Sequence, residues 1–146
     1  GMLTVLAARK APFGNVTGID TWSQEHLSEN SMEAAYENVR LERVGDRVGF
    51  EESEASELRF PTGSFDKVVS SMALHTIRKR KDRDKAVEEM IRVLKPGGHL
   101  AIMDILHTRE YEKVMRAKGM KRIRYSPMKL LYCMPTRFMI AEKAPK

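Results

Sequence analysis

The stretch from Val87 to Asp104 joins two hydrophobic patterns and constrains the fold more than any other part of the chain. Its first half carries apolar residues at helical spacing, namely Val87, Met90, Ile91 and Leu94. Pro96 cannot continue this helix, and Gly97-Gly98 supply the backbone freedom for a tight reversal. Residues 100–105 are almost entirely apolar, which is typical of a strand buried on both faces of a parallel sheet. The stretch therefore predicts half of a βαβ unit.

The rest of the chain alternates helical and extended patterns around this unit. We expect helices over 3–9, 23–44 and 111–118, and strands over 15–20, 48–52, 64–71, 121–125 and 137–142. Ser23 is a candidate N-cap for the second helix, and Pro135 argues against a continuous central strand at its position. This order predicts an α/β fold with a doubly wound, mostly parallel sheet and a C-terminal antiparallel hairpin. No linker interrupts the pattern, so we expect a single domain over residues 1–146.

Composition excludes several classes of protein. Hydrophobic residues make up 42% of the chain and charged residues 32%, as in ordinary globular proteins. The apolar runs are far shorter than the roughly 18 residues of a membrane helix, and no signal peptide opens the chain. Cys133 is the only cysteine, which excludes an internal disulfide and a cysteine-cluster metal site. We expect a cytoplasmic protein without a metal.

The net charge of +6 is unevenly distributed. Residues 78–85 hold six cations, namely Arg78, Lys79, Arg80, Lys81, Arg83 and Lys85. Such a patch can attract nucleic acid or another polyanion, but no aromatic residue interrupts it to stack on bases. A solvated helix entrance is the favoured interpretation, and nucleic-acid binding is an open alternative that is not favoured.

The sequence Arg-Val-Leu-Lys-Pro-Gly-Gly at residues 92–98, followed by an apolar strand, resembles the segment before the fifth strand of class I S-adenosylmethionine-dependent methyltransferases. The resemblance extends over nearly the whole chain, since the Rossmann-like sheet of that family also closes with an antiparallel hairpin. It implies an enzyme that transfers a methyl group from S-adenosylmethionine to an acceptor, for which a small molecule is the default. No residue identifies the acceptor atom.

In that family a first strand and a glycine-rich loop precede the first helix, and this sequence begins too late to contain the strand and most of the loop. Gly1 resembles the last glycine of the loop, although a cloning remnant before Met2 is an equal alternative. Two arrangements would close the resulting gap in the sheet. The family's second and fourth strands could pair directly, or two copies could exchange strands in a homodimer, since proteins avoid open strand edges.

Asp20 is the strongest single candidate for a binding residue. A carboxylate at the carboxyl end of this strand can accept hydrogen bonds from both hydroxyls of a ribose, and it follows Gly1 at close to the expected offset of about 20 residues. The resemblance implies that Asp20 binds the ribose of S-adenosylmethionine. The alternative is an Asp that caps the next helix. Thr21 and Trp22 follow, and Trp22 either stacks on the adenine or packs nearby.

The resemblance adds four further candidates for the cofactor site. Glu54-Ala55 aligns with the acidic residue and alanine that follow the third strand in the family and contact the adenine, although Asp is commoner than Glu there. Ser70 and Ser71 lie at the mouth of the fourth strand, where the family places residues near the methyl group and the acceptor.

His75 is the candidate catalytic base. Positioning supplies most of the rate of methyl transfer, and a base is needed only where the acceptor must lose a proton. The unperturbed pKa of a histidine near 6.5 suits that role. The alternative is a polar loop histidine without chemistry, and His107 has a weaker claim.

Two functional hypotheses therefore stay open. The first is an S-adenosylmethionine-dependent methyltransferase. The second is a catalytically inactive domain of the same fold that serves as a binding module, with a polyanion at the basic run as its candidate partner.

Overall fold

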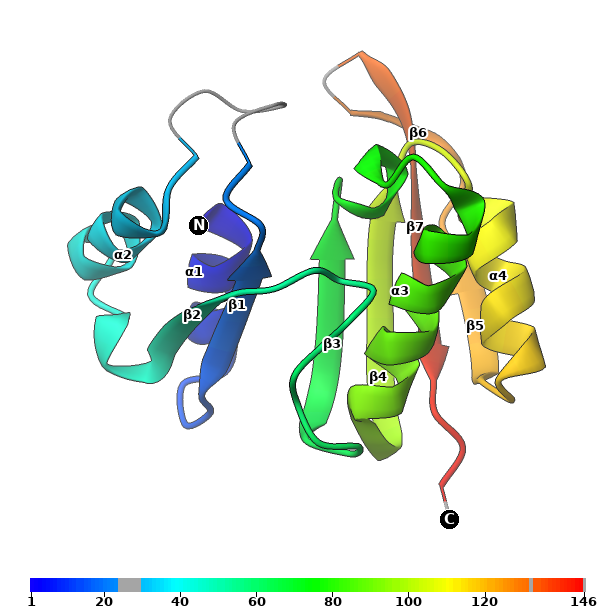
Figure 1. Cartoon of the computed structure of the whole chain (residues 1–146), viewed down its shortest axis with the longest axis horizontal. Coiled ribbons are helices and arrows are strands. Elements are labelled where there is room, and N and C mark those ends of the chain that lie inside the picture. Colours follow the sequence, from blue (N-terminus) through cyan, green and yellow to red (C-terminus); the bar gives the residue numbers. More distant parts are fainter. Residues whose placement is uncertain (24–29, 132, 146) are drawn as a thin grey trace. The chain divides into compact units, whose positions relative to one another are not determined.

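The computed structural model describes residues 1–23, 30–131 and 133–145 (Figure 1). The chain divides into two compact units, Gly1–Glu54 and Ala55–Lys146. No helix in the described residues is long and apolar enough to cross a membrane.

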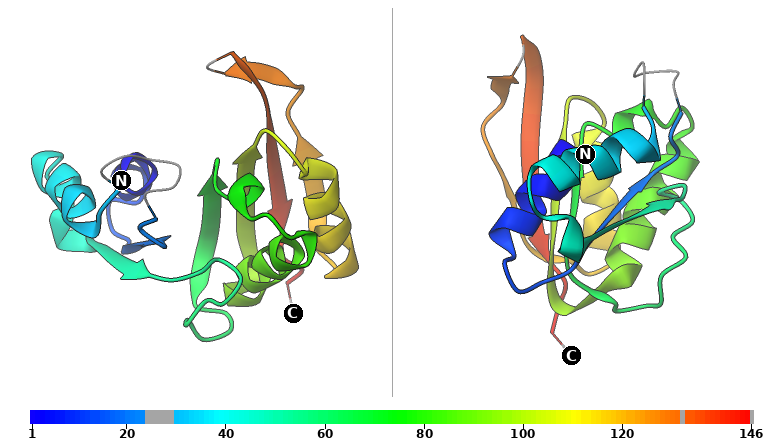
Figure 2. Two further views of the ribbon diagram at one scale, coloured as in Figure 1. Left: turned by 45° about the horizontal axis from the view of Figure 1, so that its top comes forward. Right: turned by 90° about the vertical axis from the view of Figure 1, so that its left-hand side faces the viewer.

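The N-terminal unit is a two-stranded parallel sheet with two helices on one face (Figure 2). Its elements are α1 (Met2–Lys10), β1 (Val16–Asp20), α2 (Met32–Leu41), the 3-10 turn η1 (Gly45–Arg47) and β2 (Val48–Glu52). The core consists of Val5, Ala8, Ala35, Val39, Val44, Val48 and Phe50. Gly18 is required for this packing, because a Cβ there would lie 2.7 Å from the ring of Phe50. Asp20 and Glu52 are opposite each other at the ends of the strands.

The start of α2 differs from the prediction. The helix begins at Met32, and its N-cap is Ser31, whose hydroxyl accepts a hydrogen bond from the backbone N–H of Ala34 at 3.1 Å. Ser23 is therefore not the cap. Residues 24–29 of the predicted helix lie outside the described residues. Ser23 and Ser31 both precede apolar residues at helical spacing, and the preference of serine for N-cap positions does not distinguish between them.

The C-terminal unit is a five-stranded mixed sheet with α3 and α4 on one face (Figures 1 and 2). Its elements are β3 (Phe65–Ser71), η2 (Leu74–Thr76), α3 (Arg80–Val93), β4 (Leu94–Asp104), α4 (Thr108–Ala117), β5 (Lys121–Tyr125), β6 (Lys129–Leu131) and β7 (Met134–Glu142). The main strand order is β3-β4-β7-β5. β3 and β4 are parallel, and β7 is antiparallel to both β4 and β5. β6 pairs with the first residues of β7.

The α/β class and the antiparallel closing strands are confirmed, but the strands of the described residues form two sheets. β1 pairs with β2 in one sheet and β3 with β4 in the other. The direct pairing of the family's second and fourth strands stays a prediction. Pro135 lies in β7, which begins at Met134 and so starts earlier than predicted, but the strand is not central there, as expected. Pro135 is opposite Leu130 of β6, at a point where β7 has left the main sheet and proline's missing N–H is tolerated. A single domain over residues 1–146 stays a prediction.

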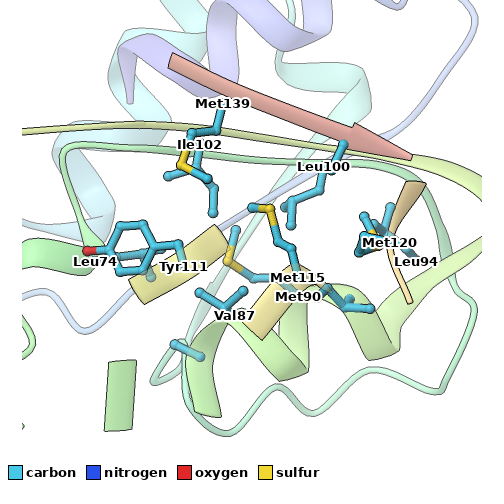
Figure 3. Close-up of a cluster of buried hydrophobic side chains, with 13 residues drawn as sticks. Leu74, Val87, Met90, Leu94, Leu100, Ile102, Tyr111, Met115, Met120 and Met139 are labelled. Carbon is cyan, nitrogen blue, oxygen red and sulfur yellow. The ribbon is translucent and has the colours of Figure 1, made fainter. Parts of the chain in front are cut away.

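The helix and the buried strand predicted from residues 87–104 are present, but residues 95–98 belong to β4 and do not form a separate turn. The register against β3 shifts there, because Phe65 is opposite Leu94 and Lys67 is opposite His99. All four predicted stripe residues are buried in the core of the C-terminal unit (Figure 3), although α3 ends at Val93 and Leu94 already belongs to β4. Gly97 has a φ of +75°, and a Cβ on Gly98 would lie 2.8 Å from the carbonyl oxygen of Lys95. The two glycines are therefore used for different reasons, one for its dihedral angle and one for close backbone approach.

Lys143 ties the end of the chain to the C-terminal end of α3. Its ammonium group donates to the carbonyl oxygens of Ile91, Arg92 and Leu94 at 2.8, 3.3 and 2.6 Å. Replacing Lys143 by Met should lower the free energy of unfolding by about 1–3 kcal/mol, because carbonyls at a helix end lose a charged donor. Urea denaturation would measure this. The matched change at exposed Lys121 should cost less than about 0.5 kcal/mol, and an equal cost at both positions would contradict the capping role.

Candidate functional site

Asp20 is held in a defined orientation at the end of β1. Its Oδ1 accepts a hydrogen bond from the backbone N–H of Trp22 at 2.9 Å and another from the side-chain amide of Asn30 at 3.2 Å. The backbone carbonyl of Asp20 accepts from Ser53 N–H at 3.1 Å, which extends the pairing of β1 with β2. Because Ser31 caps α2, Asp20 is not the cap of that helix. The partly buried carboxylate is an acceptor-only group fixed at the carboxyl end of a parallel strand.

Trp22 packs within the N-terminal unit. Its φ is +53°, and its ring meets Phe50 edge to face, with 5.9 Å between the centroids. Its indole Nε1 is buried and has no hydrogen-bond partner in the described part of the chain. Of the two alternatives, packing is therefore observed, and stacking on an adenine stays a prediction. Thr21 is exposed beside it.

The remaining candidates for the cofactor site lie at the boundaries of elements. Gly1 is exposed and precedes α1, where its carbonyl accepts from Val5 N–H at 3.1 Å. Glu54 is exposed and ends the N-terminal unit, whereas Ala55 is partly buried against the core of the C-terminal unit. The contact of this pair with an adenine stays a prediction.

Ser70 and Ser71 are the last residues of β3. Both are partly buried, and they are opposite Ile102 and Met103 of β4. A further hydrogen bond of 2.9 Å from Met72 N–H to the carbonyl of Met103 continues the pairing beyond the strand. The carboxyl ends of β3 and β4 are therefore level, and the segments that follow them emerge together.

His75 and Asp104 meet at this end of the sheet. Asp104 is fully buried at the end of β4, and its Oδ1 lies 2.5 Å from Nδ1 of His75. Its Oδ2 accepts from the backbone N–H of His75 at 3.0 Å, and Oδ1 also accepts from Ile105 N–H at 2.8 Å. An ionised carboxylate only accepts, so Nδ1 of His75 carries the proton and Nε2 is the basic nitrogen. The side chain of His75 is 19% exposed. This pair has the geometry of a histidine base oriented by a carboxylate.

Tyr111, in the first turn of α4, completes the surroundings of Asp104. Its hydroxyl donates to Oδ2 of Asp104 at 3.3 Å, and its ring is fully buried in the core shown in Figure 3. Burial, followed by the negative charge of Asp104, raises the pKa of Tyr111 above its ordinary value. The phenol therefore stays protonated and acts as a donor.

Arg83 is buried and does not belong to the exposed basic run, which corrects the interpretation of residues 78–85. Only 5% of the residue is exposed, and its guanidinium donates to the carbonyls of Ile77 and Arg78, each at 2.9 Å. It also donates to Oε2 of Glu110 at 2.9 Å. A cation buried in a helix carries no visible signal in the sequence when it stands among exposed cations.

His107 lies against the same ion pair. It adopts a left-handed conformation with φ of +60°, and its Nδ1 is 3.4 Å from both Nη2 of Arg83 and Oε1 of Glu110. Its ring is therefore engaged by charged neighbours, unlike that of His75, which is oriented by a single buried carboxylate. The weaker claim of His107 to the role of base stays a prediction.

The ion pair of Arg83 with Glu110 should make stability depend on acid pH. The hydrogen bond from Arg83 holds the pKa of Glu110 below its ordinary value of about 4.3, which applies in the unfolded chain. The ion pair therefore stabilises the fold fully above about pH 4.3, and this stabilisation is lost as the pH falls through the lowered pKa of the folded state. Glu110→Gln should lower the free energy of unfolding by about 1–3 kcal/mol at pH 7, and this difference should shrink below pH 4. Urea titrations at several pH values would measure it. Glu51→Gln, at an exposed position, is the control. If the difference in the free energy of unfolding between wild type and Glu110→Gln did not change with pH, the role of the ion pair would be contradicted.

The sequence did not identify Asp104, Glu110 and Tyr111 as functional candidates, and it placed Arg83 only in the exposed basic run. A signal existed for Asp104, because it ends a buried parallel strand in the same way as Asp20 does. The rule that selected Asp20, a carboxylate at the carboxyl end of a strand, would have selected it too. The roles of Arg83, Glu110 and Tyr111 become visible only when α3 and α4 are packed against each other and against β4.

Comparisons with known proteins identify the family and the fold. The chain matches the family model of the methyltransferase domain over residues 1–102. It is 41% identical over 81 residues to the methyltransferase GfsG of Streptomyces halstedii, covering 56% of this chain and 28% of that protein. It is 40% identical over 91 residues to the 27-O-demethylrifamycin SV methyltransferase of Amycolatopsis mediterranei, covering 62% of this chain and 30% of that protein. The matched part thus spans less than a third of each of these relatives.

A solved structure supports the fold. The N-methyltransferase NodS from Bradyrhizobium japonicum WM9, in complex with S-adenosylhomocysteine, superposes with a TM-score of 0.73. The match covers 96% of this chain and 72% of that protein, at 12% sequence identity. At that identity the likeness establishes the fold alone.

Proposed function

The chain belongs to the methyltransferase domain family, and we propose that it binds S-adenosylmethionine and transfers the methyl group to a small-molecule acceptor. The matched region contains both Asp20 and His75. Two relatives are named as methyltransferases, one of them for a demethylated rifamycin, which favours a small acceptor. The observation that carries the proposal is the oriented carboxylate of Asp20 at the end of a parallel strand.

Asp20 fits the ribose of this ligand in its chemistry. An ionised carboxylate has about four acceptor positions, and among the described residues two are used, by Trp22 and Asn30 on Oδ1. The described residues leave capacity for two hydroxyl donors, which is what a ribose presents. In this proposal Gly1, Thr21, Trp22, Glu54, Ala55, Ser70 and Ser71 are the further residues of the cofactor site.

The bound cofactor supplies a methyl group on a positively charged sulfur. The chain's own contribution is to hold the reactants in line and, where the acceptor carries an acidic hydrogen, to remove it. His75 is the residue proposed for that proton, because its Nδ1 is committed to Asp104 and its Nε2 is the basic nitrogen.

Calorimetric titration of the purified chain with S-adenosylhomocysteine tests the proposed function. We expect saturable binding with a stoichiometry of about one ligand per chain. Adenosine alone should bind more weakly, because it lacks the homocysteine portion. No heat of binding at any ligand concentration, for a chain shown to be folded by circular dichroism, would contradict the proposal.

Assembly and location are further parts of this proposal. We propose a cytoplasmic protein and, in solution, a homodimer that exchanges strands. Sedimentation velocity of the chain would test the dimer, and a single monomeric species at micromolar concentration would contradict it.

A further inference from the structure

We infer that Asp104 and the first turn of α4 position His75 as a base for a hydroxyl acceptor, so that the reaction is an O-methylation. The inference rests on the proposed function and names the class of its acceptor. It assigns Asp104, Tyr111 and Glu110 as positioning residues, which act through His75 and do not touch the reactants.

The first connection runs from Tyr111 through Asp104 to His75. Among the described residues Asp104 accepts four hydrogen bonds, from Nδ1 and the backbone N–H of His75, from Ile105 N–H and from the Tyr111 hydroxyl. Both Asp104 and Tyr111 are fully buried. A buried carboxylate is costly unless its oxygens are satisfied, and here the bonds come from three different segments. The carboxylate can therefore neither rotate nor leave Nδ1 of His75 without losing another partner.

The second connection runs from Glu110 through Arg83 to the segment that follows His75. Glu110 pairs with the buried guanidinium of Arg83, which donates to the carbonyls of Ile77 and Arg78. These carbonyls immediately follow η2, the short turn that contains His75. Glu110 and Tyr111 are consecutive residues, so one turn of α4 fixes both the imidazole and the backbone beside it.

This arrangement sets the tautomer of His75. With Nδ1–H donated to Asp104, the lone pair of Nε2 is free to take a proton, and the imidazolium that forms is stabilised by the carboxylate. A base held in this way is useful to an acceptor that must lose its proton as it reacts. A neutral amine attacks through its own lone pair and does not need such a base. A thiol also loses its proton but ionises near neutral pH with little help, whereas a hydroxyl becomes a strong nucleophile only as its proton leaves.

The reaction transfers the methyl group from sulfur to oxygen in one displacement. The hydroxyl oxygen of the acceptor forms the new O–CH3 bond while the S–CH3 bond breaks, and that bond's electron pair stays on sulfur as a neutral thioether. The hydroxyl proton passes to Nε2 of His75 and later to water. No oxidant, reductant or metal is required.

The tautomer of His75 can be measured on the whole chain without any ligand. Long-range 15N–1H NMR spectra of neutral imidazole should show Nδ1 of His75 protonated. Asp104→Asn should shift the population toward the Nε2–H form, because an amide can donate to Nδ1. Exposed His99 is the internal control and should keep its tautomer in both proteins. A wild-type His75 with its proton on Nε2 would overturn the positioning role, as would an unchanged tautomer in a folded Asp104→Asn variant.

Activity with labelled S-adenosylmethionine completes the test. We expect methylation of alcohols or phenols in a panel that also contains amines and thiols. Asp104→Asn should lower kcat by about 100-fold or more, with the KM of the acceptor changed less than about 3-fold. Tyr111→Phe should lower kcat by about 3- to 10-fold while His75 keeps its tautomer. Methylation of amines or thiols alone would overturn the hydroxyl assignment, although the proposed function would stand.

Failure of the proposed function has a different signature. In that case S-adenosylhomocysteine would not bind, and the hydroxyl assignment would fall with the enzyme. The NMR measurement would still decide whether Asp104 orients His75, because it needs neither cofactor nor acceptor.

Discussion

Replacing Asp20 by Asn should weaken the binding of S-adenosylhomocysteine by about 100-fold. The change removes the charge and one acceptor oxygen while keeping the size of the side chain and an oxygen for the N–H of Trp22. Each hydrogen bond from a ligand hydroxyl to a carboxylate contributes about 1.5–3 kcal/mol, and about 1.4 kcal/mol corresponds to a factor of 10. Calorimetric titration of the two proteins under identical conditions measures the difference.

Asp46→Asn is the matched control for this prediction. Asp46 is an exposed carboxylate of the same unit, in η1, so its neutralisation changes the net charge equally. The affinity of the Asp46→Asn protein for S-adenosylhomocysteine should stay within about 2-fold of that of the wild type. Equal affinities of the wild-type and Asp20→Asn proteins would remove Asp20 from the cofactor site.

Replacing Leu100 by Ala should cause the largest loss of stability that we predict. Leu100 is fully buried on β4, beneath α3 and α4, in the cluster of Figure 3. Truncations of this kind cost about 2–5 kcal/mol through lost burial and the cavity that remains. Small domains are stable by only about 5–15 kcal/mol, so the variant should unfold at a much lower urea concentration.

Val69→Ala provides the contrast on the neighbouring strand. Val69 lies on β3 opposite Ala101 and is 47% exposed, so its truncation should cost less than about 1 kcal/mol. Similar midpoints for the two variants would show that β4 is not the centre of the core. Because β4 ends at Asp104, loss of its packing should also disturb the tautomer of His75.

The sequence alone predicted the C-terminal half of the fold best. Residues 87–104 carry a helical stripe, a proline, two glycines and a buried strand in direct succession, so each local signal supports the next. The structure shows that helix and strand, but the strand begins at Leu94, so the proline and both glycines lie inside β4 and not in a turn before it. Family membership followed from the same stretch.

Three features of the structure depend on tertiary packing, and local sequence patterns did not predict them. The pairing of His75 with Asp104 joins residues 29 positions apart, on segments whose alignment is set by the register of β3 and β4. Arg83 stands in a run of cations, yet α4 supplies the partner that allows its burial. The choice of Ser31 over Ser23 as a helix cap is a difference between two residues of equal intrinsic preference.

The most direct test of the central claim, that Asp20 binds a ribose, combines two ligands with two proteins. Wild-type chain and Asp20→Asn are each titrated with S-adenosylhomocysteine and with its analogue lacking the 2′ and 3′ hydroxyls. If the carboxylate binds those hydroxyls, the wild-type protein should lose about 100-fold in affinity for the analogue, and Asp20→Asn should lose less than about 3-fold. An equal loss in both proteins would show that the hydroxyls bind elsewhere and would contradict the account.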